Sequence, residues 1–343
     1  MKKDICSMYP GELEAELIAM GEAPYRAGQI FEWLHAKNAA SFDEMTNISK
    51  SLRARLDDEY YIAVPEPVQV LDSKIDGTKK FLFRLYDGNV IESVRMEYKY
   101  GSSLCISSQA GCRMGCKFCA STIGGLERSL NPSEMLWQVY RVQALTGGRI
   151  SHVVVMGSGE PMDNYDSFVR FVRLITDRKG SDLSVRSITV STCGIPDRIR
   201  QLADEGLGIT LALSLHAPSD EIRRKIMPIA YRYPLSEVLA ACDYYFEKTG
   251  RRVSYEYSLI RGVNDSPEDA RALAALIAKR PVHVNLIPIN PVKERDFSRP
   301  GGERTAVFKN TLEKNGINAT IRREMGQDIN GACGQLRRSY KES

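Results

Sequence analysis

The sequence has few of the features that mark secreted, membrane or disulfide-rich proteins. Its 343 residues include only eight cysteines, too low a density for a disulfide scaffold. No run approaches the ~18 apolar residues of a membrane helix, and Met1–Cys6 lacks the apolar segment of a signal peptide. These absences predict a cytoplasmic protein without membrane association, in which clustered cysteines favour metal or redox chemistry over disulfides.

Strong charge is also missing. Lys and Arg total 47 against 43 Asp and Glu, and a net charge of +4 is too small to indicate a nucleic-acid-binding protein. No arginine-rich run or basic patch interleaved with aromatics occurs. Basic groups at Arg322–Arg323, at Arg337–Arg338 and within 293–304 could contact phosphate, although a solvated surface is the simpler interpretation.

What is present is an ordinary globular composition, 43% hydrophobic and 26% charged. At about 150 residues per domain, this length favours one large domain with an accessory unit. Helical spacing of apolar residues over 11–20, 25–36 and 49–56 predicts a small helical accessory domain at residues 1–62.

A β-rich segment follows at residues 63–98. Its apolar runs are separated by Asp76–Gly77 and by Asp87–Asn89, which are turn signals typical of β-hairpins. We therefore expect this segment to form a β-hairpin extension between the accessory domain and the rest of the chain.

From residue 99 to residue 343, short apolar strands alternate with helices. This pattern is typical of a parallel sheet that is covered on both faces, and six β/α units indicate an incomplete barrel rather than a full eightfold one. We predict an α/β fold, an incomplete (β/α)6 barrel. The expected strands are 104–106, 152–156, 187–191, 209–214, 253–259 and 283–287. The expected helices are 132–146, capped by Asn131 and Glu134, then 165–178, 196–205, 219–226, 235–249 and 266–280. A last helix (303–314) and strand (317–322) are expected after the sixth unit.

The sharpest motif is a C-x3-C-x2-C run, Cys112, Cys116 and Cys119, directly after the first barrel strand. Three thiolates within one short segment can hold one face of a metal centre. A [4Fe–4S] cluster normally takes four cysteine ligands, so three would leave one iron open to a substrate or cofactor. The alternative is a structural zinc site, which requires a fourth ligand. The nearest candidate is Cys105, and no histidine is close.

Polar residues and glycines recur where the predicted barrel strands end. Active sites of barrels collect at this face, glycine allows close backbone approach, and a carboxylate such as Glu160 can accept from an ammonium group. For each residue alone, an ordinary turn or packed side chain is the simpler interpretation. Together they form a candidate polar rim, which consists of Gly159, Glu160, Ser191, Ser214, Leu215, His216 and Asn290.

Two further cysteines have a distinctive context. Cys105 lies at the first barrel strand, and Cys333 lies between Gly331 and Gly334 near the C-terminus. Buried cysteines are usually inert, but the flanking glycines favour an exposed thiol at Cys333.

These motifs resemble the radical-SAM superfamily and, more narrowly, the RlmN/Cfr family of radical-SAM RNA methyltransferases, with the RlmN type as the nearer match. The resemblance spans nearly the whole chain. It is carried by Cys105–Cys112 (CISSQAGC), Gly157–Pro161 (GSGEP), Ser214–His216, Asn290–Pro291 and Ala332–Leu336 (ACGQL), and at the front of the chain by Met20–Gln29 and Phe42–Lys50.

The resemblance implies a [4Fe–4S] cluster on Cys112, Cys116 and Cys119, and two molecules of S-adenosylmethionine per turnover that bind at the polar rim. It implies methylation at C2 of one adenosine in 23S rRNA and of the adenosine 3′ of the anticodon in some tRNAs. Cys333 would carry the methyl group, Cys105 would resolve the protein–RNA adduct through a disulfide with Cys333, and Glu92 would accept a proton. Further implied partners are an external electron donor such as flavodoxin or ferredoxin, and the chain is expected to be a monomer.

The sequence departs from the family pattern at three positions. Ser158 replaces a methionine that is usual between the two glycines, and Asn330 and Gly331 replace Asp and Ala before Cys333. Two alternatives stay open: methylation at C8 of a 23S rRNA adenosine, the Cfr type that confers antibiotic resistance, and a non-catalytic iron–sulfur or zinc protein that binds RNA.

Overall fold

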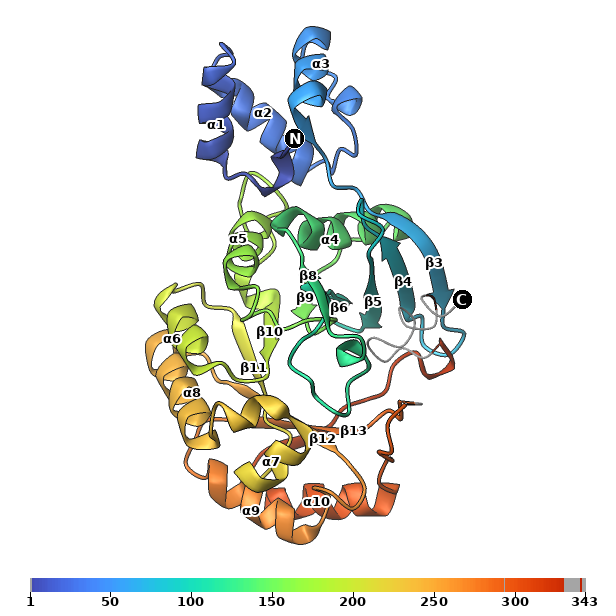
Figure 1. Ribbon diagram of the computed structural model, residues 1–343, viewed down its shortest axis with the longest axis vertical. Coiled ribbons are helices and arrows are strands. Elements are labelled where there is room, and N and C mark those ends of the chain that lie inside the picture. The colour runs from blue at the N-terminus through green and yellow to red at the C-terminus, as the bar shows by residue number, and fades with distance from the viewer. Residues whose placement is uncertain (1, 293, 330–339, 341–343) are drawn as a thin grey trace.

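The computed structural model describes residues 2–292, 294–329 and 340. A small helical unit stands at one end of the molecule (Figure 1). It contains β1 (Lys3–Asp4), a 3-10 turn (Ile5–Ser7), α1 (Pro10–Ala19), α2 (Tyr25–His35), a second 3-10 turn (Phe42–Glu44), α3 (Lys50–Glu59) and β2 (Tyr60–Tyr61). Strands β1 and β2 pair in parallel and close the unit. The three expected helices are confirmed.

This unit docks on α4 (Pro132–Thr146) and α5 (Tyr165–Ile175) through polar contacts. His35 Nδ1 lies 3.0 Å from the hydroxyl of Tyr140, and Ser133 Oγ donates to Asp4 at 2.5 Å. Buried apolar residues of the unit and of the barrel belong to one contiguous core. The division of the chain at residues 62 and 98 into separate domains stays a prediction.

A ten-stranded sheet forms the centre of the molecule (Figure 1). Seven neighbouring strands run parallel and follow one another in chain order. They are β6 (Gly101–Cys105), β9 (His152–Val155), β10 (Ile188–Thr192), β11 (Thr210–Ser214), β12 (Ser254–Leu259), β13 (His283–Pro288) and β14 (Ala319–Ile321). The first six are the predicted barrel strands, and β14 adds a seventh parallel strand at the open edge.

Helices lie between successive parallel strands, as the alternation predicts. Besides α4 and α5 they are α6 (Pro196–Asp204), α7 (Asp220–Ile226), α8 (Leu235–Thr249), α9 (Pro267–Ile277) and α10 (Gly302–Lys314), with short 3-10 turns at Val185–Ser187, Pro228–Tyr231 and Gln327–Ile329. Capping residues fix several bounds. A capping box between Asn131 and Glu134 starts α4, and Gly147 ends it in the left-handed conformation that glycine favours.

The parallel strands differ from the prediction in one respect. Burial alternates along β9, β10 and β13, so these strands are not covered on both faces, whereas β11 and β12 contain the unbroken buried runs that were expected. Ile188 and Val190 of β10 are fully buried, whereas Thr189 and Ser191, which alternate with them along the strand, are only partly buried. The second face lines the inside of an open barrel, and this inner face carries polar side chains.

The β-rich segment continues the same sheet. Strands β3 (Glu66–Asp72), β4 (Lys79–Arg84) and β5 (Val90–Tyr98) pair antiparallel, and β5 then pairs with β6. The register aligns Lys80 with Val94, and Val94 with Cys105. Because directly paired residues project to the same side of a sheet, these side chains share one face.

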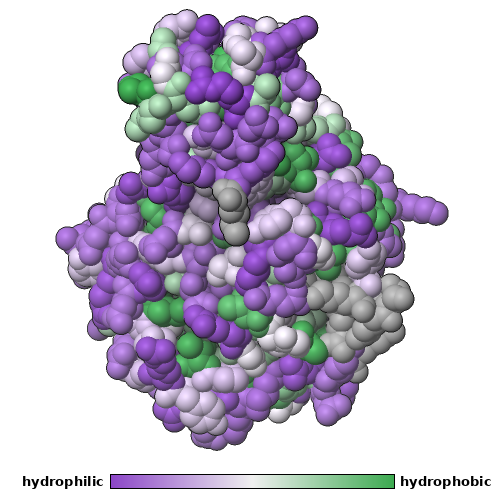
Figure 2. All heavy atoms as spheres, turned by 45° about the horizontal axis from the view of Figure 1, so that its top comes forward, coloured by the Kyte–Doolittle hydropathy of each residue, from purple (hydrophilic) through white to green (hydrophobic). Residues whose placement is uncertain are grey.

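None of the helices in the described part of the chain is long and apolar enough to cross a membrane. The face shown in Figure 2 carries mostly hydrophilic side chains, and the hydrophobic ones lie between them singly or in small groups. This face therefore offers no broad apolar surface for docking.

Candidate active site

The three motif cysteines lie on a loop beyond the end of β6. The loop connects β7 (Gln109–Gly111) to β8 (Leu126–Ser129), which pair antiparallel, and contains a 3-10 turn at Ala120–Thr122. The backbone N–H of Cys112 donates to Gly125 at 2.9 Å, and Thr122 Oγ1 donates to the carbonyls of Cys116 and Cys119, also at 2.9 Å. Hydrogen bonds within the loop therefore hold the backbone that carries the thiols.

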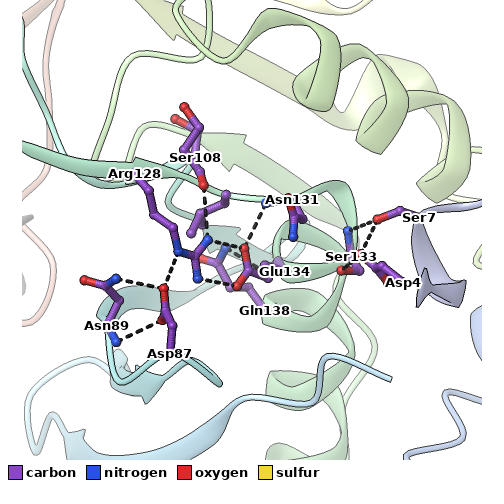
Figure 3. A network of polar contacts seen from close by, with 12 residues as sticks. Asp4, Ser7, Asp87, Asn89, Ser108, Arg128, Asn131, Ser133, Glu134 and Gln138 are labelled. Atoms are coloured by element: carbon purple, nitrogen blue, oxygen red, sulfur yellow. Dashed lines mark hydrogen bonds and ion pairs between the residues drawn. The ribbon is translucent and has the colours of Figure 1, made fainter. Parts of the chain in front are cut away.

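A polar network anchors the base of this loop (Figure 3). Arg128 on β8 donates to both carboxylate oxygens of Glu134 at 2.7 Å and also to Asp87 at the β4–β5 turn. Glu134 accepts the N–H of Asn131 at 2.8 Å, so its predicted capping role is confirmed. The network ties the cysteine loop to α4 and to the antiparallel strands.

The chemistry of the three thiols fits an iron–sulfur cluster. Cysteine thiolates are the usual ligands of a [4Fe–4S] cluster, and three of them on one short loop would leave one iron open. The thiols are close enough to influence one another electrostatically. Among the described residues, no group of three Cys, His, Asp or Glu side chains is placed to hold a single metal ion, as a zinc site requires.

Two glycines are required where β9 ends. A Cβ on Gly157 would lie 2.6 Å from the carbonyl oxygen of Ile106. Gly159 has φ +110°, and a Cβ there would lie 2.6 Å from Cβ of Gln109. Ser158 between them is 2% exposed, and its N–H donates to Ser107 Oγ at 3.1 Å. The turn after β9 is therefore packed tightly against the segment that leads to the cysteine loop.

Glu160 lies inside the rim and is 3% exposed. Its Oε2 accepts the N–H of Cys193 at 2.7 Å, and its Oε1 accepts the N–H of Met162 at 3.0 Å. Burial raises the pKa of Glu160, and these hydrogen bonds oppose that rise. Each oxygen retains a lone pair that could accept from an ammonium group.

The other rim residues occupy the ends of neighbouring strands. Ser191 of β10 and Ser214 of β11 lie with their hydroxyl oxygens 3.2 Å apart. Leu215 is fully buried, and its backbone N–H and carbonyl are both bonded within the protein. Asn290 is exposed, two residues beyond the end of β13. The structure thus brings the two serines together and leaves Asn290 at the outer edge.

His216 holds a strained position, with φ +56°. Its Nδ1 accepts the N–H of Ser258 at 2.9 Å, and its carbonyl accepts from Asn264 at 2.7 Å. Burial lowers the pKa of His216 to about 3, so the ring is neutral and its Nε2 carries the proton. The ring of Phe118, between the second and third motif cysteines, meets it edge-on with centroids 4.9 Å apart.

Glu92 and Cys105 lie on the opposite flank of the barrel. Glu92 pairs with Lys80 of β4 at 3.0 Å, and the two side chains are 2% and 0% exposed. Burial raises the pKa of Cys105 to about 11, against the lowering effects of Arg322 and Lys80. The structure therefore brings Glu92, Lys80 and Cys105 into one neighbourhood.

Cys333, Asn330 and Gly331 lie outside the described residues. The seven described cysteines are all free thiols, so the predicted disulfide between Cys105 and Cys333 is not present in this structure. The physical reason lies in the reaction expected, because that disulfide would exist only between the breakdown of an adduct and the next reduction.

Sequence reasoning missed two fully buried cations, Lys80 and Arg223. A signal existed for Lys80, because both faces of 79–84 are apolar and one of its two lysines must therefore point inward. Arg223 is one of three consecutive basic residues, Arg223–Lys225. The only sequence signal that it is the buried one is its position three residues before the apolar Ile226, on the same face of the helix.

Comparisons with known proteins identify the family to which this chain belongs. The model of the radical SAM superfamily matches residues 106–274, and that of the ribosomal RNA large subunit methyltransferase N-terminal domain matches residues 3–62. A protein of Lachnoclostridium phytofermentans named "Probable dual-specificity RNA methyltransferase RlmN" is 60% identical over 341 residues, 99% of this chain and 96% of its own length. The chain belongs to the RlmN family of radical-SAM RNA methyltransferases.

Other RlmN-family relatives agree. The protein of the same printed name from Clostridioides difficile is 52% identical over 330 residues, 96% of each chain. The crystal structure of a radical SAM methyltransferase from Sphaerobacter thermophilus is 42% identical and matches with a TM-score of 0.93 over 97% of this chain and 98% of that one. The predicted fold and enzyme class are confirmed, and radical-SAM membership brings a [4Fe–4S] cluster and S-adenosylmethionine as cofactors.

Proposed function

We propose that this chain is a dual-specificity RNA methyltransferase. It methylates C2 of one adenosine in 23S rRNA and C2 of the adenosine 3′ of the anticodon in some tRNAs. The observation that carries this proposal is a second thiol site, the half-buried Cys105 beside the buried pair Glu92 and Lys80, on the barrel that carries the cysteine loop. Simple methyl transfer within one cofactor site would not require it. The printed names of the RlmN relatives support the dual specificity.

The cofactors occupy the rim side of the barrel. Cys112, Cys116 and Cys119 hold the cluster, and when bound there the cluster and S-adenosylmethionine supply a 5′-deoxyadenosyl radical, with a second S-adenosylmethionine as methyl source. The tight turn at Gly157 and Gly159 allows close backbone approach. Neutral His216 offers a donor at Nε2. The residues proposed to bind S-adenosylmethionine are Gly159, Glu160, Ser191, Ser214, Leu215, His216 and Asn290.

The side of the barrel that carries Cys105, Glu92 and Lys80, which we call the thiol side, supplies the covalent steps. Adenine C2 is electrophilic and has no nucleophilic lone pair, so it cannot attack a methylsulfonium directly. Cys333, methylated on sulfur by one S-adenosylmethionine, would lose a hydrogen atom of that methyl group to the 5′-deoxyadenosyl radical, and the carbon left with the unpaired electron would bond to C2. The hydrogen of C2 then leaves as a proton and an electron, which the oxidised cluster would take up, so that a thioether joins the protein to the RNA. Glu92 accepts a proton, and the Cys105 thiolate then attacks the sulfur of Cys333. The sulfur–carbon bond breaks as the disulfide forms, its electron pair stays on the carbon attached to C2, and that carbon takes up a proton to become the methyl group. A cellular dithiol then reduces the disulfide and returns both cysteines to thiols.

Lys80 supports the role of Glu92. Its ammonium lies 3.0 Å from the carboxylate in a fully buried setting, and this ion pair fixes the position of the carboxylate beside the strand that carries Cys105. Ser107 Oγ donates to the backbone carbonyl of Glu92 at 2.8 Å and fixes the strand at this point. The partners we propose are 23S rRNA, tRNA and an external electron donor such as flavodoxin or ferredoxin. The protein acts as a monomer in the cytoplasm, away from membranes.

Mapping the modified atom tests this function. RNA from a strain with the enzyme should carry a methyl group at adenine C2 in both 23S rRNA and tRNA, and RNA from a deletion strain should lack both. A methyl group at C8 would favour the Cfr-type reaction instead. In vitro, Cys333→Ala should abolish methylation while Cys6→Ala, a substitution of a buried cysteine in the helical unit, should retain it.

A further inference from the structure

Arg223 is a fully buried arginine on α7, between the ends of the barrel strands and the cysteine loop. Its Nε donates to the carbonyl of Leu215 at 3.2 Å. Its Nη2 donates to the carbonyls of Cys193 at 2.5 Å and of Ser214 at 3.3 Å. Its Nη1 is buried too and has no hydrogen-bond partner among the residues that the structure describes.

The charge of Arg223 is not balanced by these contacts. All three acceptors are neutral carbonyls. Asp220 on the same helix attracts Arg223 but forms no ion pair with it in the described structure, and its carboxylate accepts the N–H of Leu235 at 2.9 Å. Burying a guanidinium without an anion is strongly unfavourable. A fixed buried cation with a free donor therefore indicates that an anion belongs next to it.

The cysteine loop lies directly against the segment that carries Arg223. Lys117 N–H donates to the carbonyl of Ile226 at 2.9 Å, and Gly115 approaches Pro228 so closely that a Cβ would lie 3.3 Å from its ring. Cys116 packs against the small apolar cluster that contains Cys193 and Ile226. In their thiolate forms Cys193 and Cys116 attract the Arg223 guanidinium, so both side chains lie in its neighbourhood.

We propose that Arg223 is a positioning residue that sets the reduction potential of the cluster on Cys112, Cys116 and Cys119. This inference rests on the proposed function, because it presumes that the loop carries the cluster. A cluster bound by three thiolates is anionic, and it gains one further negative charge when an external donor supplies one electron. No protein bond forms or breaks in this step. A fixed cation nearby stabilises the reduced state more than the oxidised state, so it makes the midpoint potential less negative.

Three variants test the proposal in the full-length, anaerobically reconstituted protein. Arg223→Gln removes the charge, Arg223→Lys retains it, and Arg224→Gln removes the charge of an exposed neighbour on the same helix. The readouts are iron per chain and the midpoint potential from a redox titration with dithionite, followed by electron paramagnetic resonance in the absence of S-adenosylmethionine. We expect a more negative potential for Arg223→Gln, and values near that of the unmodified protein for Arg223→Lys and Arg224→Gln.

The outcomes separate this inference from the proposed function. Failure of the unmodified protein to take up about four irons would overturn the proposed function itself. An unchanged potential in fully loaded Arg223→Gln would overturn only the role of Arg223, as would a shift in Arg223→Lys as large as that in Arg223→Gln. If both Arg223 variants lose iron equally in the oxidised and reduced states, the residue only supports packing and the proposal is wrong. Iron loss from Arg223→Gln mainly on oxidation would contradict it as well, whereas loss mainly on reduction would support it.

Discussion

The two flanks of the barrel each bury a cation, but they treat it differently. Lys80 on the β4 flank faces the carboxylate of Glu92 at 3.0 Å, so its charge is balanced within the protein. Arg223 on the α7 flank contacts carbonyls alone and retains a free N–H donor within the described structure. The difference teaches that the buried charge on the thiol side is balanced by a side chain of the protein itself. On the side of the cysteine loop, the charge of Arg223 is balanced by the bound cluster that we propose.

The largest effect is expected when the cluster, the anion that we propose beside Arg223, can no longer bind. Cys116→Ala should reduce reconstituted iron from about four per chain to near zero and abolish formation of 5′-deoxyadenosine, because a tridentate site loses one ligand. Iron assay and chromatography of the products measure this. Cys193→Ala is the matched control, since Cys193 is buried beside the loop but lies outside the motif. Equal iron loss in both variants would contradict the assignment of the ligands.

Breaking the balanced pair should have the next largest effect. Glu92→Gln removes the carboxylate that pairs with the buried Lys80 and should reduce the free energy of unfolding by about 3–5 kcal/mol. It should also slow methylation by about 10²–10⁴-fold, as expected when a positioned proton acceptor is removed. Urea unfolding and single-turnover methylation are the measurements.

Two comparisons sharpen that result. Lys80→Met combined with Glu92→Leu removes both charges and should be more stable than Glu92→Gln. Lys79→Met removes the exposed pair with Asp72 and should change the free energy of unfolding by less than about 1 kcal/mol. If Lys79→Met and Glu92→Gln were equally destabilising, burial of the pair would not be the cause.

His35 is a further buried basic side chain, but it is neutral and needs no counter-charge. Its effect on the free energy of unfolding should be the smallest of the three. Burial lowers the pKa of His35 to about 3, against about 6.5 in an unfolded chain. Between these values the unfolded state binds a proton that the folded state does not, so stability falls as the pH decreases from 6.5 toward 3, by at most about 1.4 kcal/mol per pH unit. From pH 7 to pH 5.5, urea unfolding should show about 1 kcal/mol less loss in His35→Gln than in the unmodified protein. At pH 8 this contribution should vanish.

Much of the fold was predictable because its signals are local. The capping box at Asn131 and the glycine at 147 place α4 at 132–146, as predicted, and the turns at Asp76–Gly77 and Asp87–Asn89 do lie between antiparallel strands. The polar rim at the strand ends was predicted, but the alternation of burial along β9, β10 and β13 was not. It depends on the curvature of the sheet, which decides that residues such as Ser191 face an interior and not a second layer of helices.

The functional site could likewise be predicted only where its signals are local in the sequence. The cysteine spacing predicts the loop, because three ligands in one short segment require no knowledge of the fold. Arg223 and Lys80 could not be assigned in this way, since their importance arises from neighbours that are distant in sequence: Cys193 and Leu215 for Arg223, and Glu92 and Cys105 for Lys80.

The pairing of β5 with β6 makes the chemistry of the thiol side sensitive to the length of the chain. Val94 lies opposite Cys105, and Glu92 is two residues before Val94 on the same strand. In a strand, each residue added or lost turns every later side chain to the other side. Loss of one residue between Glu92 and Val94 would therefore direct Glu92 away from the thiol without changing a single functional group. We therefore expect substitutions along β5 to be tolerated far better than insertions or deletions.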